Sequence, residues 1–247
     1  MLFGIVEQYF KEDKTALRVR QGGAADEQPR RPVRRDSGTR GGGDSGTRGG
    51  RTMTPAQQRA LAAIRADLGR LARYDDESIV NDLWLRRRYD GGRFANYGEA
   101  RRATVTTAWH EAGHAVAALA VGARFRSASI HPGRDTEGRV HGIQATGDLA
   151  FVVDAAGQIA ERLMAWTLPS DDELRAWLPA WRDDGGDARR FRAAIRQRFG
   201  DDEFAAWRFC EEKLVPERLK IRQVARALLV HPRHIPHAVV AAVAGDR

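Results

Sequence analysis

Two histidines and a glutamate stand close together near the middle of the chain, in the segment His110-Glu111-Ala112-Gly113-His114. On a helix, residues four apart lie on one face, one turn from each other. Both imidazoles can then reach a single Zn²⁺ at about 2.0–2.1 Å. The glutamate can hydrogen-bond a water held by the ion and take its proton, and zinc brings the pKa of such a water to about 7. The segment therefore predicts metal-dependent hydrolysis, with His110 and His114 as ligands and Glu111 as general base.

The alternative interpretation is a helix with two histidines satisfied in a core. Small neighbours argue against it, because Ala112, Gly113 and Ala115 leave room for close packing and for a substrate. A zinc peptidase needs a third protein ligand and one open position. A longer metallopeptidase pattern would place Gly at 117 and His at 120, but the chain has Ala117 and Ala120. The third ligand must therefore come from further along the chain.

Two later carboxylates are candidates for that ligand. Asp187 follows two glycines and opens a predicted helix, although an Asp at such a place more commonly caps the helix. Glu161 lies inside the predicted helix 148–165, where a salt bridge to Arg190 or Arg192 is the simpler role. A carboxylate from a later helix is a known zinc ligand, so the residues alone leave both candidates open.

The elements that must position these side chains are mostly helical. The motif helix is predicted over 99–121 and ends before Gly122, a natural residue at a helix C-terminus. Alternating residues predict strands at 125–130 and 139–143, joined as a hairpin. Further helices are predicted at 54–73, 77–88, 148–165, 171–181, 187–198, 201–214, 216–230 and 236–243. We expect a mainly α, helical zinc-metallopeptidase domain with a small β-hairpin or sheet beside the motif helix.

The first 52 residues differ from the rest in composition. They are rich in Gly and Arg, and an eight-residue repeat spans 36–50. Such a segment cannot bury enough apolar area to offset its chain entropy, so it is expected to be disordered. It is alternatively a mis-assigned upstream extension, because Met53 is followed by Thr54-Pro55, a good helix start. The metallopeptidase-like domain is expected over 53–247.

Charge and cysteine content limit the kinds of partner and metal site that we expect. The net charge is +8, but residues 1–52 carry 11 Lys and Arg against 7 Asp and Glu, so the domain itself is only mildly basic. We expect no nucleic-acid partner. Cys210 is the only cysteine, which excludes an intramolecular disulfide and a cysteine-rich zinc site. No stretch reaches the ~18 apolar residues of a membrane span, and a cytoplasmic location is expected.

The segment from Thr107 to Val116 resembles the motif helix of the FtsH-type ATP-dependent zinc metallopeptidases. The resemblance covers about residues 98–230 and extends to four further segments, at 127–138, 157–163, 186–194 and 223–229. It implies that Asp187 is the third zinc ligand. We place Glu161 beside the site, where it orients a ligand or an arginine.

The chain departs from that family in two ways. It has no apolar span and no Gly-x-x-x-x-Gly-Lys-Ser/Thr loop for ATP. We expect a stand-alone metalloendopeptidase with Zn²⁺ as cofactor and a protein or peptide as substrate. The alternatives are an inactive or regulatory metal-site module that binds an ATPase, and a narrow-specificity cytoplasmic regulatory peptidase. A separate ATPase or unfoldase and a homo-oligomer are the other expected partners.

Five more histidines follow the motif. His131 and His141 flank the predicted hairpin, where they either line a substrate cleft or are simply exposed. The segment from His231 to His237 contains three histidines and two prolines, and we expect it to be a solvated turn.

Overall fold

Long helices and very short strands make up the described part of the chain. A computed structural model of the protein describes residues 52–80, 85, 96–131, 138–145, 147–181 and 186–245. These residues all belong to one unit, Gly50–Arg247. The predicted disordered arm or extension at 1–52 lies outside the described residues, except for Thr52.

The helices and strands are α2 (Pro55–Arg70), α4 (Tyr97–Ala120), β1 (Ser127–Ser129), β2 (Arg139–His141), α5 (Ala150–Met164), α6 (Asp171–Trp177), the 3₁₀ helix η1 (Leu178–Ala180), α7 (Asp187–Phe199), α8 (Glu203–Leu214), α9 (Arg218–Val230), β3 (Ile235–Pro236) and α10 (His237–Ala244). The described part of the chain is thus mainly helical with one small antiparallel sheet. This confirms the prediction of a mainly helical domain with a small sheet.

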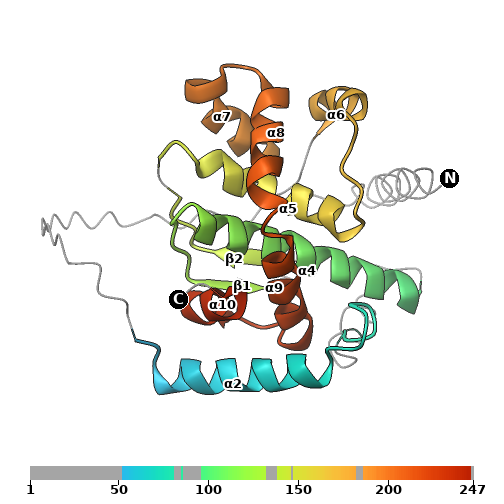
Figure 1. Ribbon diagram of the computed structural model, residues 1–247, viewed down its shortest axis with the longest axis vertical. Coiled ribbons are helices and arrows are strands. Elements are labelled where there is room, and N and C mark those ends of the chain that lie inside the picture. The colour runs from blue at the N-terminus through green and yellow to red at the C-terminus, as the bar shows by residue number, and fades with distance from the viewer. Residues whose placement is uncertain are drawn as a thin grey trace, which may run out of the picture. The chain divides into compact units, whose positions relative to one another are not determined.

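Helix α4 is the central element of this unit and carries the histidine motif. It begins after Asn96, whose side chain accepts a hydrogen bond from the backbone N–H of Glu99, and this satisfies one of the free donors of the first turn. It ends just before Gly122, which has φ +71°. Its largest packing partners are α5 and α9, and the sheet lies against it as well (Figure 1). A helix covered on several sides holds its side chains in fixed positions.

The sheet has the strand order β2-β1-β3, so β1 is central and β2 lies at an edge. The predicted hairpin is confirmed, with Ala128 opposite Val140. The third strand corrects our expectation of a solvated turn at 231–237. Ile235 pairs with Ala128 and is 3% exposed, because the apolar side chain between the two prolines joins the core.

Capping residues and prolines determine where other helices begin and end. Thr54 begins α2, as the sequence predicts, and it forms a reciprocal capping box with Gln57. The predicted helix 171–181 ends early, at Trp177, and continues as the 3₁₀ turn around Pro179, which has no N–H to extend an α-helix. The predicted helix 77–88 is wrong over 77–80, which form turns; of the rest, only residue 85 is described.

Buried side chains from all the described α-helices and the sheet form one hydrophobic cluster. Its largest fully buried members are Trp109 of α4, Phe151 of α5, Phe191 of α7 and Trp207 of α8. The helices that carry the candidate site residues therefore share a single core. Among the described helices, none has both the length and the apolar character required to cross a lipid bilayer.

Candidate metal centre

The two motif histidines lie one turn apart on α4 and point the same nitrogen atom at each other. The distance between His110 Nε2 and His114 Nε2 is 3.0 Å. This is the arrangement that the spacing of four predicts. Both imidazoles can therefore offer Nε2 to one common point.

Helix α5 contacts the Nδ1 atom of each of the two rings. His110 Nδ1 lies 2.6 Å from Glu161 Oε1, and His114 Nδ1 lies 2.7 Å from the backbone oxygen of Val153. A carbonyl oxygen can only accept, so His114 donates from Nδ1, and in its neutral form Nε2 keeps its lone pair. Glu161 fixes the same tautomer in His110. Both rings are oriented as metal ligands usually are in proteins.

Asp187, the first residue of α7, completes the group. Its Oδ2 atom lies 3.6 Å from His110 Nε2 and 3.4 Å from His114 Nε2. The residue before it, Gly186, has φ +82° and is the N-cap, and Asp187 is 8% exposed. Gly186, and not Asp187, is therefore the N-cap of α7, and Oδ2 of Asp187 faces the two histidines.

Arg190 holds the other oxygen of that carboxylate. Its guanidinium bonds Asp187 Oδ1, and its Nε donates to Asp154 Oδ1 on α5 at 2.9 Å. The salt bridge considered for Glu161 is thus not formed with Arg190, and Arg192 instead pairs with Glu203 at 2.7 Å. Arg190 leaves Oδ2 of Asp187 facing the two imidazoles.

The donor set fits a zinc ion. Three donors at about 2.0–2.1 Å from a tetrahedral ion lie about 3.3 Å from one another. The three separations here are 3.0, 3.4 and 3.6 Å, and the donors are two nitrogens and one oxygen. Among the described residues, His110, His114 and Asp187 form a group able to hold a metal ion. Three protein ligands and one free position are typical of catalytic zinc.

The ionisable side chains of this group shift one another's pKa values. Burial would raise the pKa of Asp187, but the neighbouring imidazoles of His110 and His114 hold that pKa well below its usual range. Burial would lower the pKa of His110, yet its bonds to Asp187 and Glu161 raise the pKa well above its usual value. The carboxylate is therefore ionised, which is the form that binds a metal ion.

Glu111 is also a residue of α4, and its side chain lies beside this group, against Gly138 just before β2. It is 7% exposed, and burial raises the pKa of its carboxyl, against the opposing effect of His110 and His114. The chain passes close by at Gly138, where a Cβ atom would lie 2.7 Å from Glu111 Cγ. Glycine at this position gives the carboxylate the space that it occupies.

Two more glycines make the site possible. A Cβ at Gly113 would lie 2.4 Å from the backbone oxygen of Ala156, so α4 and α5 approach closely only without a side chain there. A Cβ at Gly157 would lie 2.4 Å from His110 Nε2. The small residues around the motif had suggested close packing, whereas the need for glycine at Gly157 shows only in three dimensions.

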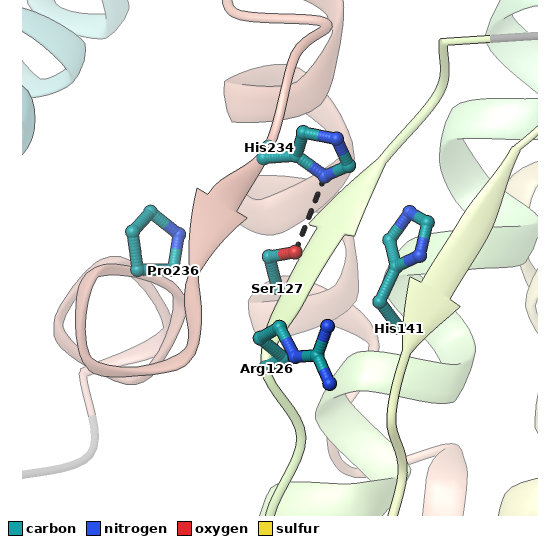
Figure 2. A pocket seen from close by; sticks show the side chains of 5 residues that line it. All are labelled: Arg126, Ser127, His141, His234 and Pro236. Carbon is teal, nitrogen blue, oxygen red and sulfur yellow. Dashed lines mark hydrogen bonds between the residues drawn. The ribbon is translucent and has the colours of Figure 1, made fainter.

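The other histidines lie elsewhere. His131 is exposed, and His231 bonds Asp67 at 2.9 Å. His141 lines a hollow together with His234, and neither belongs to the metal-binding group (Figure 2). The structure therefore brings together His110, His114, Asp187, Glu111 and Glu161.

Comparisons with protein-family models, curated proteins and solved structures found no match to the chain. The interpretation of the site consequently rests on its own geometry and on the motif.

Proposed function

We propose that the protein is a zinc-dependent metalloendopeptidase. The observation that carries the proposal is the convergence of two imidazole Nε2 atoms and one carboxylate oxygen within 3.0–3.6 Å, beside the buried Glu111. His110, His114 and Asp187 are the proposed zinc ligands. The likeness of the segments around His110 and Asp187 to FtsH-type metallopeptidases supports a polypeptide as the substrate.

Each residue has a part in the proposed reaction. Zinc, when bound, supplies a Lewis acid that polarises a scissile carbonyl and makes water more acidic. Glu111 accepts a proton from the attacking water and later delivers it to the leaving amine. Its buried carboxylate is fixed between α4 and β2, so it needs little reorganisation to do so.

Residues around the site orient the proposed ligands. Glu161 and the carbonyl of Val153 orient the two imidazoles, and Arg190 orients the carboxylate of Asp187. Such outer contacts support metal affinity as well as activity. A cytoplasmic location and delivery of substrate by a separate ATPase are further parts of the proposal.

The test compares the wild-type protein with Glu111→Gln and Asp187→Ala, measuring zinc content by elemental analysis and cleavage of casein. Glu111→Gln should keep its zinc and lose about 10²–10⁴-fold in rate, as expected when a general base is removed. Asp187→Ala should lose both zinc and activity. Glu212→Gln, an exposed change of the same kind on α8, is the control.

Two results would contradict the proposal. Wild-type cleavage by Glu111→Gln would rule out the mechanism. Zinc binding by the wild type with no cleavage of casein, or of a peptide library, would favour the metal-site module that binds a partner.

A further inference from the structure

A second cluster of ionisable side chains lies on the small sheet, apart from the metal-binding group. The register places Ser127 of β1 opposite His141 of β2 on one side and Pro236 of β3 on the other. These three residues, with Arg126 and His234, line an open hollow of about 430 Å³ (Figure 2). The hairpin of β1 and β2 and the distant strand β3 thus build one concave surface.

The side chains in this hollow contact one another. His234 Nδ1 lies 3.3 Å from Ser127 Oγ, and the rings of His141 and His234 meet edge to face with their centroids 4.8 Å apart. In Figure 2 the two imidazoles and the Arg126 side chain lie around Ser127. When the Ser127 hydroxyl donates to Nδ1 of His234, Nε2 of that ring carries the proton and can donate to a ligand.

The lining of the hollow includes the guanidinium of Arg126 and no carboxylate. Arg126 is charged at any accessible pH. Burial lowers the pKa of His141, and the neighbouring His234, Arg139 and Arg126 lower it further. The guanidinium of Arg126 in the lining, with Arg139 nearby, favours an anion over a cation in this hollow.

Transition metals are a poorer fit than anions. Two histidines without an acidic ligand make an incomplete metal site, and the permanent charge of Arg126 disfavours another cation. A guanidinium and imidazole N–H groups are instead the donors that recognise phosphate oxygens.

We propose that this hollow is a phosphate-binding site. The Arg126 guanidinium and the N–H groups of His141 and His234 donate to the phosphate oxygens, and Ser127 positions His234. The ligand class is inorganic phosphate or a phosphate monoester. The proposal is independent of the proposed peptidase function, since none of these residues belongs to the metal-binding group.

The test is an NMR titration of the full-length protein with sodium phosphate at constant ionic strength and pH. The imidazole signals of His141 and His234 are assigned from His141→Asn and His234→Asn. Both signals should shift and saturate with phosphate but not with sodium chloride. A parallel titration with O-phosphoserine distinguishes a preference for the monoester from one for the free anion.

Two arginine substitutions then distinguish specific phosphate binding in the hollow from a general effect of the protein's net charge. Arg126→Ala should weaken phosphate binding by about tenfold or more, because a hydrogen bond to a charged group contributes at least that much. Arg196→Ala, which removes the same charge from an exposed position on α7, should bind like the wild type. Equal shifts in phosphate and chloride, or unchanged binding by Arg126→Ala, would overturn the proposal.

Discussion

At the scale of single residues, the site depends on atoms that turn the two imidazoles to the same point. Glu161 lies on the Nδ1 side of His110, whereas Asp187 lies on the Nε2 side. An ion bound between the Nε2 atoms would touch Asp187 and not Glu161. The two carboxylates that the sequence left open thus have distinct geometric roles.

This difference predicts unequal effects of removing each carboxylate. Glu161→Ala should weaken zinc binding by about 10–100-fold, as is usual for a group that orients a ligand. Asp187→Ala should abolish stoichiometric binding, because it removes a ligand. Competition with a chromophoric chelator measures both, with Glu212→Ala as the control. If Glu161→Ala lost zinc while Asp187→Ala kept it, the proposed ligand set would be wrong.

The sequence could predict only part of this arrangement. The spacing of His110 and His114 on a helix is enough to place both rings on one face. The partner of His114 is a backbone oxygen, that of Val153, and no side-chain pattern indicates such a partner. Arg190 was considered only as a partner for Glu161, because nothing local distinguishes the acids on α5 that it can reach.

At the scale of elements, the close approach of α4 and α5 brings the histidines to the groups that orient them. Gly113 is the contact point, where a Cβ atom would lie 2.4 Å from the backbone of α5 and 2.6 Å from Ala160 Cβ. Backbone atoms cannot move aside as a flexible side chain can. The separation of the two helices is therefore sensitive to a single methyl group.

Gly113→Ala should lower the free energy of unfolding by about 1–3 kcal/mol, the usual cost of overpacking, and should also weaken zinc binding. Gly69→Ala is the matched control, since a Cβ at that position in α2 meets nothing within 4 Å. This control should raise the free energy by about 0.5–1 kcal/mol, because alanine is favoured over glycine in a helix. Urea unfolding monitored by circular dichroism measures both. Equal stability of the two variants would contradict the packing argument.

Strand β3 shows where element prediction from the sequence fails. Its two residues, Ile235 and Pro236, are too few for any alternation to appear, and the neighbouring prolines favour a turn. The strand exists because Ile235 pairs with Ala128 of β1, more than 100 positions earlier in the chain. The hairpin of β1 and β2 was predictable because its partners are close in sequence and alternate.

At the scale of the whole molecule, the candidate site joins two helices that share α5 as their main packing partner and differ in the second. Helix α4 packs mainly against α5 and α9, whereas α7 packs mainly against α5 and α8. His110 and His114 come from α4, and Asp187 comes from α7. A bound ion would connect α4 to α7 directly, so that metal binding should stabilise the fold as well as provide the chemistry.

Zinc should therefore raise the melting temperature of the wild-type protein. A ligand present at 100 times its dissociation constant stabilises the native state by about 2.7 kcal/mol. For a domain of this size that corresponds to a shift of about 5–10 °C. Differential scanning calorimetry with zinc and with a chelator measures the shift. Asp187→Ala should remove this zinc-dependent shift, and Asp201→Ala, at an exposed acid beyond the end of α7, should keep it. A full zinc-dependent shift in Asp187→Ala would show that α7 takes no part in binding the ion.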